Sequence, residues 1–221
     1  MKKAIVFIFV LTLGINLMMV AQTKSTGPKM TKFVIHTDYG DMKGFLYNET
    51  PKHRDNFVKL AKAGYFDGLL FHRVISGFMI QGGDPDSKNA KPGQVLGSGG
   101  PGYTVPAEFN PKFIHKKGAM AAARTGDQIN PQKASSGSQF YIVQGQKWDP
   151  AQLEGRYPNK YSTDQKQEYK NLGGTPFLDG EYTVFGEITA GLDVLDKIAA
   201  VEKDKSDRPL KDVKMTVKII E

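Results

Sequence analysis

The chain contains eight short strand-like segments that do not alternate regularly with helices, and this order limits its possible folds more than any other feature. Parallel sheets need helical crossovers between strands, so the pattern favours an antiparallel barrel or sandwich. A closed barrel would also leave no exposed sheet edges. The expected segments are two strands within residues 31–50 and single strands at 68–75, 78–82, 118–124, 138–144, 181–188 and 213–220.

Two substantial helices are expected beside these strands. Thr50 and Pro51 form the pattern of an N-cap and a first-turn proline, and the apolar residues that follow share one helical face until Gly64. Residues 191–201 have the apolar spacing of a second helix. Residues 87–109 are rich in glycine and proline, so an ordered loop is predicted there.

A polar stretch at about residues 147–174 is predicted to be a surface insertion of helix and loop. Within it, Ser162 and Gln165 have the spacing of a capping box at the start of a helix. Gly173 and Gly174 would end that helix.

Residues 1–21 have the pattern of a secretory signal peptide, with Lys2 and Lys3 before an apolar run. Cleavage would leave residues 22–30 as a polar linker and place the mature protein in the periplasm or outside the cell. The alternative is an uncleaved helix that anchors the protein in the membrane, because the apolar run is near the shortest span length. The chain has no cysteine, which permits export without demonstrating it.

Without the leader the chain has 200 residues, a size that fits one domain with one hydrophobic core. It then carries 28 basic and 23 acidic side chains, and this modest excess is spread along the sequence. A nucleic-acid interface would require a concentrated basic stripe, so no nucleic-acid partner is expected. A monomer is the default expectation, with no stable membrane association once the signal has been removed.

The stretch FHRVISGFMIQGGD, residues 71–84, places one arginine and one glutamine in a mostly apolar run, without an obvious nucleophile or paired carboxylates. Four further motifs follow in order: GSGGPGYTVPAEF, GAMAAAR, SSGSQFYIV and TPFLDGEYTVFGEI. Together they resemble cyclophilin-type peptidyl-prolyl cis-trans isomerases from about residue 31 to residue 221. The resemblance implies a mainly β fold, in which two α-helices cap a closed eight-stranded antiparallel barrel and the active groove lies on the outer wall.

The resemblance also implies roles for individual residues. Arg73 would be the catalytic arginine, and Gln81 would orient it and contact the substrate backbone. Ala123 and Gln139 would line the pocket for the residue before proline, and the backbone at Arg124 would bind peptide. The proline pocket would be formed by Phe78, Met79, Phe140, Leu178 and Tyr182.

Phe177 stands where some family members carry tryptophan. The resemblance therefore implies weaker cyclosporin binding than in the tryptophan-bearing relatives. The insertion at 147–174 also departs from the short connection of minimal family members, so its role stays open.

The chemistry of proline isomerisation explains why the motif needs no nucleophile. Rotation about an X-Pro amide breaks no bond, but it meets a barrier of ~18–20 kcal/mol. A guanidinium such as that of Arg73 stays charged and can stabilise the twisted amide by hydrogen bonding without proton transfer. Proline-containing polypeptides, including unfolded or exported clients, are thus the expected partners.

Two readings of the groove stay open at this point: an isomerase, or a proline-peptide binding or chaperone module whose turnover is incidental. Strand alternation predicts that His72 points away from the face of Arg73. No metal is expected, because His36, His53 and His115 show no metal-ligand spacing. No cofactor is expected either.

Overall fold

The computed structural model describes residues 30–220. The predicted signal peptide and residues 22–29 of the predicted linker lie outside the described residues. Within residues 30–220, no helix combines the length and apolar character that crossing a membrane requires.

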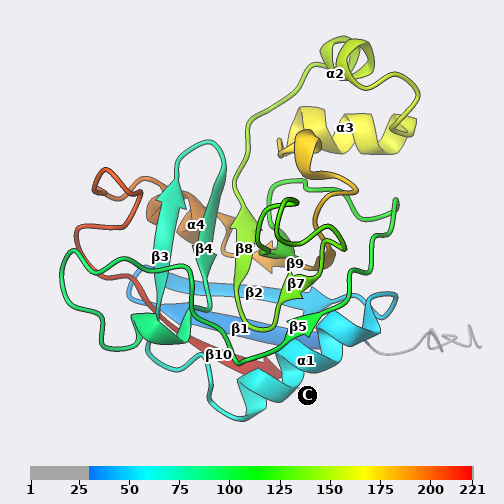
Figure 1. The fold of residues 1–221 in the computed structure, drawn as a ribbon. Helices are drawn as coiled ribbons and strands as arrows, with labels where there is room; N and C mark the ends of the chain where they lie inside the picture. Colours follow the sequence, from blue (N-terminus) through cyan, green and yellow to red (C-terminus); the bar gives the residue numbers. More distant parts are fainter. Residues whose placement is uncertain (1–29, 221) are drawn as a thin grey trace, which may run out of the picture.

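Eight antiparallel strands close into a barrel in the order β1-β10-β3-β4-β8-β6-β9-β2 (Figure 1). This confirms the predicted closed barrel over the alternative of a sandwich. The strand bounds lie within a few residues of those predicted from the sequence. They are β1 Thr31–Thr37, β2 Gly40–Leu46, β3 Leu69–Ile75, β4 Met79–Gly82, β6 Ala119–Ala122, β8 Phe140–Val143, β9 Val184–Ala190 and β10 Lys214–Ile220.

The first hairpin shows how local sequence fixes the barrel's register. At its turn, Thr37 donates its hydroxyl to the Gly40 carbonyl at 2.8 Å, and Gly40 has a φ of 124° that favours glycine. Further along β2, a bulge lies between Lys43 and Gly44 where the strand pairs with β9. A Cβ at Gly44 would lie 2.2 Å from the Glu187 carbonyl oxygen, so this close approach requires glycine.

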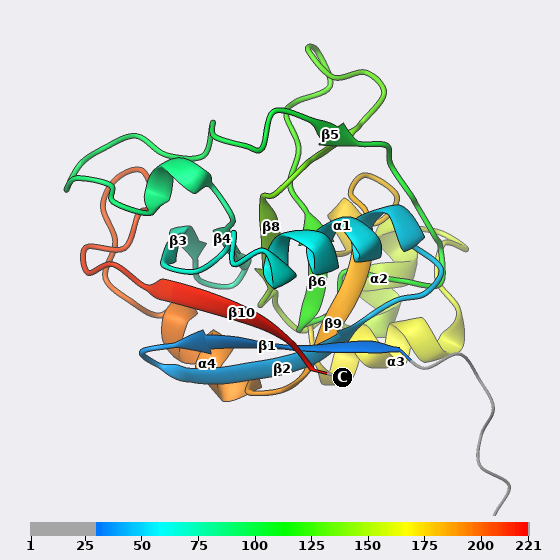
Figure 2. The ribbon, with the colours of Figure 1, turned by 90° about the horizontal axis from the view of Figure 1, so that it is seen from below.

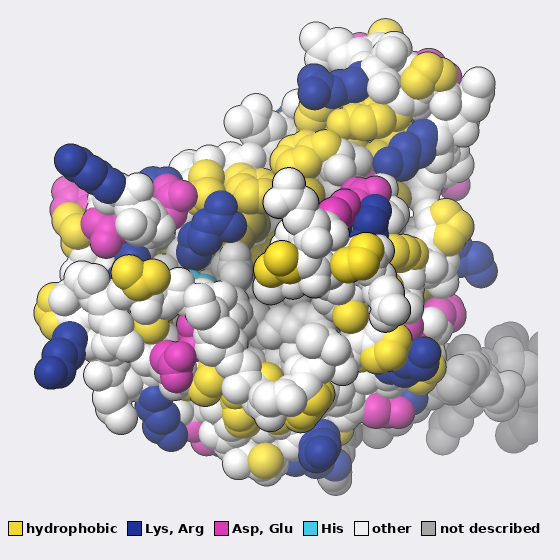
Figure 3. Space-filling view, viewed as in Figure 1, with side chains coloured by type: hydrophobic (Ala, Val, Ile, Leu, Met, Phe, Trp, Pro, Cys, Tyr) yellow, Lys and Arg dark blue, Asp and Glu magenta, His cyan; other side chains and the backbone are white. Residues whose placement is uncertain are grey.

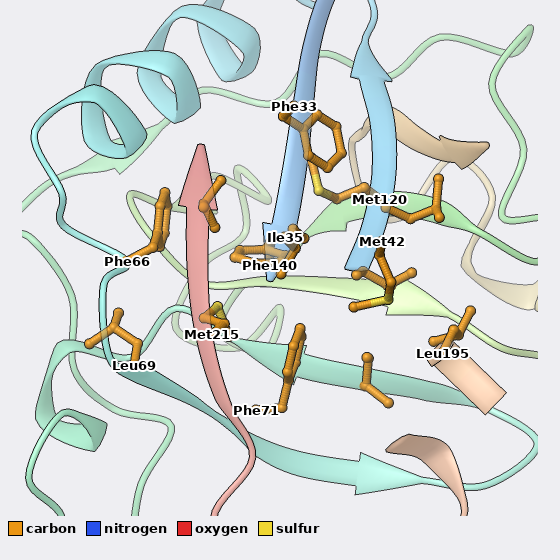
Figure 4. Close-up of a cluster of buried hydrophobic side chains, with 14 of the residues drawn as sticks. Phe33, Ile35, Met42, Phe66, Leu69, Phe71, Met120, Phe140, Leu195 and Met215 are labelled. Atoms are coloured by element: carbon orange, nitrogen blue, oxygen red, sulfur yellow. The ribbon is translucent and has the colours of Figure 1, made fainter. Parts of the chain in front are cut away.

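The barrel interior is filled by large apolar side chains (Figure 4). Phe140 lies among them with 1% of its surface exposed. Its ring meets those of Phe57, Phe66 and Phe71 edge to face, with centroids 5.5, 5.7 and 6.4 Å away. Such aromatic packing contributes to stability beyond the area that it buries.

Two helices cover the barrel, as predicted. Helix α1, Pro51–Lys62, packs against β9 and β10, and α4, Leu192–Ala199, packs against β2, β3 and β4. Figure 2 shows them on different sides of the strands. The apolar face of each helix joins the barrel core through buried side chains: Phe57, Leu60 and Ala61 from α1, and Val194, Leu195, Ile198 and Ala199 from α4.

The insertion contains two helices rather than the one expected. Helix α3, Thr163–Asn171, begins with the predicted capping box of Ser162 and Gln165. Helix α2, Pro150–Arg156, was not predicted, although Asp149 and Pro150 supply an N-cap and a first-turn proline. Both helices stand at the top of Figure 1.

The insertion has a small core of its own, which its polar sequence did not suggest. Leu153, Tyr161 and Tyr169 pack with Ile114 from the main domain. Tyr169 and Leu153 are fully buried. The insertion is therefore packed onto the domain rather than merely exposed on its surface.

The predicted ordered loop at 87–109 crosses the molecule with little regular structure. A short 3₁₀ turn, Pro85–Ser87, ends at the first residue of the loop, and β5, Thr104–Val105, pairs with β7, Ser135–Ser136, as a separate two-stranded sheet. This small sheet was not predicted, because two-residue strands leave no periodic signal in the sequence.

Candidate active site

Arg73 and Gln81 face each other across neighbouring strands. Arg73 lies on β3 and Gln81 on β4, and the two are register partners in the barrel wall. Arg73 Nη1 donates to Gln81 Oε1 at 3.3 Å. Within residues 30–220, no carboxylate forms a salt bridge with Arg73. Its guanidinium therefore keeps donors for a ligand.

A chain of side-chain amides continues from Gln81 and holds it in place. Gln81 Nε2 donates to Gln139 Oε1 at 3.0 Å, and Gln139 Nε2 donates to the carbonyls of Gly97 and Gly99 at 2.9 and 2.8 Å. The buried carboxylate of Asp84 accepts from the Gly97 N–H at 2.5 Å. This network fixes the Gln81 oxygen that receives Arg73.

An open cavity of about 380 Å³ lies beside Arg73 on the outer barrel wall. Figure 3 shows this face of the molecule, which is hollowed near its centre with apolar and basic side chains at the edge. The structure places eight of the predicted site residues in the cavity wall: Arg73, Phe78, Met79, Gln81, Ala123, Arg124, Leu178 and Tyr182.

Phe140 does not belong to this pocket, and its predicted role was wrong. Gln139, Phe140 and Tyr141 are consecutive, and side chains alternate between the two faces of a strand. Phe140 points into the barrel core, whereas Tyr141 lines the pocket. The Tyr141 ring packs edge to face on Tyr182 with centroids 5.8 Å apart. Alternation within SQFYIV was the signal that could have identified Tyr141.

Two other predicted residues lie close to the cavity without lining it. Gln139 is 6% exposed and acts behind the wall through its bonds to Gln81 and the loop. Phe177 lies at the rim in a 3₁₀ turn, Pro176–Leu178, and is 49% exposed. Its ring packs against Phe78 at a centroid distance of 5.7 Å.

The side chain of Arg124 is engaged in contacts within the protein, so the predicted peptide contact would fall to its backbone. Arg124 Nε donates to the Glu181 carbonyl at 2.9 Å, and Nη1 pairs with Asp127 at 2.5 Å. The guanidinium also lies over the Tyr182 ring, 4.5 Å from its centroid. These contacts hold Tyr182 in the pocket wall.

The residues that line the cavity on the other side of Arg73 were not predicted from the sequence. His72 lines the cavity instead of pointing away from it, because a bulge between Phe71 and Arg73 breaks the strand alternation. Burial lowers the pKa of His72. The rest of this wall comes from two loops distant in sequence, and it consists of Gly93, Gln94, Val95, Leu96, Gly97, Asp204, Ser206 and Arg208.

The two loops are joined by Arg208. Its Nη1 donates to the carbonyls of Lys91 and Gln94, each at 2.9 Å, and its Nη2 pairs with Asp212 at 3.3 Å. Such long-range contacts have no local sequence signal. Over residues 30–220, no group of three or more histidine, cysteine or acidic side chains is arranged to hold a metal ion.

The fold and pocket can now be compared with known proteins. Residues 32–219 match the family model described as cyclophilin type peptidyl-prolyl cis-trans isomerase/CLD. The chain belongs to this family. A Staphylococcus aureus relative assigned as a peptidyl-prolyl cis-trans isomerase is 39% identical over 183 residues, which cover 82% of this chain and 87% of the relative. The family resemblance inferred from the motifs is confirmed.

Another relative shows the domain within a longer protein. A Streptococcus pyogenes protein described as a bifunctional phosphatase/peptidyl-prolyl cis-trans isomerase is 40% identical over 194 residues, which span 85% of this chain but only 37% of that protein. The cyclophilin-type region is the part that the two proteins share.

Solved structures of cyclophilin-type isomerases have the same fold. One from Cryptosporidium parvum aligns with a TM-score of 0.66 at 27% identity, covering 87% of this chain and 99% of that one. A second structure of the same enzyme, in the presence of the dipeptide Ala-Pro, gives a TM-score of 0.64 at 26% identity, with 86% and 99% covered. This cyclophilin-type protein is thus a peptidyl-prolyl cis-trans isomerase, and its family binds proline-containing peptides.

Proposed function

We propose that this isomerase acts on proline-containing segments of exported proteins and that Arg73 stabilises the twisted X-Pro amide. The observation that carries the mechanism is a guanidinium without a carboxylate partner among the described residues, held by Gln81 at a pocket that has apolar and aromatic side chains in its wall. The export role is supported by the sequence pattern of residues 1–21.

The pocket holds the proline ring while the rest of the peptide turns. Apolar and aromatic side chains from different elements surround the space: Phe78, Met79, Tyr141, Leu178 and Tyr182. A ring fixed there lets the acyl side rotate about the C–N bond. Groups that bind the twisted amide better than either planar isomer lower the barrier.

Arg73 supplies the electrostatic part of this stabilisation. As the amide twists, its resonance is lost and the prolyl nitrogen gains a lone pair that can accept a hydrogen bond. The guanidinium is already charged and oriented by Gln81, so little reorganisation is needed when the lone pair forms. No proton has to be transferred.

Substitution of Arg73 tests this mechanism. Loss of a preorganised donor to a transition state costs about 100- to 1,000-fold in rate, so Arg73→Ala should lower kcat/KM by about that factor in an X-Pro peptide assay. Arg73→Lys keeps the charge but not the planar fork and should lose less. Arg54→Ala removes an arginine on α1 that pairs with Asp55, and it should leave kcat/KM unchanged.

The same variant separates catalysis from binding alone. A protein that acts mainly as a proline-peptide binding module would still assist folding when Arg73→Ala has lost isomerisation. If Arg73→Ala retained wild-type isomerisation, the mechanism would be wrong. For the export role, mass spectrometry of the protein from its native host should show a mature amino terminus at Gln22, whereas an intact Met1 in the cytosolic fraction would contradict it.

A further inference from the structure

A chain of buried hydrogen bonds joins the pocket to the insertion at 147–174. Tyr141, in the pocket wall, has its hydroxyl 2.9 Å from His115 Nε2, and His115 Nδ1 lies 2.7 Å from Asp179 Oδ1. The other oxygen of Asp179 accepts from the hydroxyls of Tyr161 and Tyr169 at 2.8 and 2.5 Å. Both tyrosines belong to the insertion.

The direction of the bonds to Asp179 follows from the groups involved. A carboxylate can only accept, so His115 Nδ1 carries a proton and donates to Asp179. Burial raises the pKa of Tyr141, Tyr161 and Tyr169, and Asp179 raises it further in each case. The three hydroxyls therefore remain protonated, and those of Tyr161 and Tyr169 donate to Asp179.

Asp179 depends on the insertion for half of its hydrogen bonds. The carboxylate is 7% exposed and also accepts from the His115 backbone N–H at 2.7 Å. Its remaining two donors are the insertion hydroxyls, and that of Tyr161 also lies 2.9 Å from the Pro176 carbonyl. A buried carboxylate that loses its donors is costly, so the segment at Asp179 would move or admit water.

Movement of Asp179 would reach the pocket by two routes. Leu178, which lines the pocket, is its chain neighbour. Through His115 the Asp179 carboxylate also fixes the Tyr141 hydroxyl. The rings of His115 and Tyr141 stack with centroids 6.0 Å apart. Tyr182 packs in turn on Tyr141. The positions of three residues that line the pocket, Leu178, Tyr141 and Tyr182, thus depend on the Asp179 carboxylate.

The insertion is also attached to the domain by its backbone at both ends. Gln146 and Lys116 each form a bridge with Gly174, and the Thr175 N–H donates to the His115 carbonyl at 2.8 Å. Trp148 Nε1 donates to the Gly174 carbonyl at 3.1 Å. These backbone contacts fix the position of the insertion, so the hydroxyls of Tyr161 and Tyr169 are held against Asp179.

We propose that the insertion positions the proline pocket, with Tyr161 and Tyr169 as positioning residues that act through Asp179 on Leu178 and Tyr141. This inference rests on the proposed use of the pocket to seat proline. It assigns the insertion a part in substrate binding rather than in partner recognition. Neither tyrosine lines the pocket.

The test removes the two hydroxyls and leaves the rings in place. In the double variant Tyr161→Phe/Tyr169→Phe, kcat/KM for an X-Pro peptide should fall about tenfold, mostly through a higher KM, because the binding walls loosen while Arg73 is untouched. Tyr157→Phe is the matched control: Tyr157 lies in the same insertion and packs on Tyr161, but it makes no bond to Asp179. It should leave both constants unchanged.

A double-mutant cycle shows whether the effect travels through Tyr141. Tyr141→Phe cuts the chain at the pocket end, so adding the two insertion substitutions should then cost much less than in wild type. A full and additive loss in the Tyr141→Phe background would overturn the route through His115. NMR tests the route through Leu178. The methyl signals of Leu178 should shift in the double variant and not in Tyr157→Phe.

A purely structural insertion gives a different result. If the double variant unfolds at lower temperature but keeps wild-type kcat and KM while folded, the proposal is wrong. Should the double variant not fold, the single substitutions carry the same comparison with Tyr157→Phe. Failure of the Arg73 mechanism can be told apart from failure of this proposal. The first would show as wild-type activity in Arg73→Ala, whereas the KM of the double variant and the Leu178 methyl signals report on the residues that line the pocket.

Discussion

The two faces of one barrel wall differ in what their side chains do, and adjacent residues on β8 show the contrast best. Phe140 points inward, where aromatic rings surround it on three sides. Tyr141 points outward, where its ring lines the pocket and its hydroxyl joins the network of His115. The inner face holds the fold together, and the outer face combines apolar walls with directed polar groups. Substitutions on the two faces should therefore separate stability from activity.

The largest effect is expected on the inner face. Phe140→Ala would leave a cavity among rings that cannot all collapse into it, so the free energy of unfolding should fall by about 3–5 kcal/mol. Urea unfolding monitored by circular dichroism would measure it. The proposed difference between the two faces would be wrong if Phe140→Ala kept wild-type stability and lost peptide binding, since that result would place the Phe140 ring in the pocket.

The contrast also explains which parts of the site could be read from the sequence. The strands were predictable because turn residues and alternating side chains are local signals, and Arg73 and Gln81 fall on facing strands that a short turn joins. Phe140 was wrongly assigned to the proline pocket because the resemblance was judged on the motif SSGSQFYIV as a whole. Side-chain alternation within that motif places Phe140 and Tyr141 on opposite faces of the strand.

Other features depend on contacts between segments far apart in sequence. His72 reaches the cavity only because a bulge interrupts β3, and no local signal marks that bulge. Tyr169 lies in a polar helix, and its burial depends on docking against Ile114 and Asp179. Arg208 joins two loops more than a hundred residues apart. Such contacts arise from tertiary packing and could not have been predicted from periodicity.

A smaller effect, confined to activity, is expected for Gln81 on the outer face. Gln81→Ala removes the acceptor that orients Arg73, so kcat/KM should fall about tenfold while the free energy of unfolding changes by less than ~1 kcal/mol. Gln81→Leu is the matched control for side-chain bulk: it fills much of the same space without an acceptor for Arg73, so it should lose as much activity as Gln81→Ala. Wild-type kcat/KM in Gln81→Leu would mean that Gln81 does not act by orienting Arg73.

The smallest effect is expected at the rim, where Phe177 is half exposed and packs only on one edge of the pocket through Phe78. Phe177→Trp adds an indole N–H donor, and one additional hydrogen bond should tighten cyclosporin binding about fivefold. Isothermal titration of both proteins would measure this, with urea unfolding expected to be unchanged because the site is exposed. Nanomolar cyclosporin binding by the wild-type protein would contradict the prediction, because the pocket would then bind the ligand tightly without the indole donor.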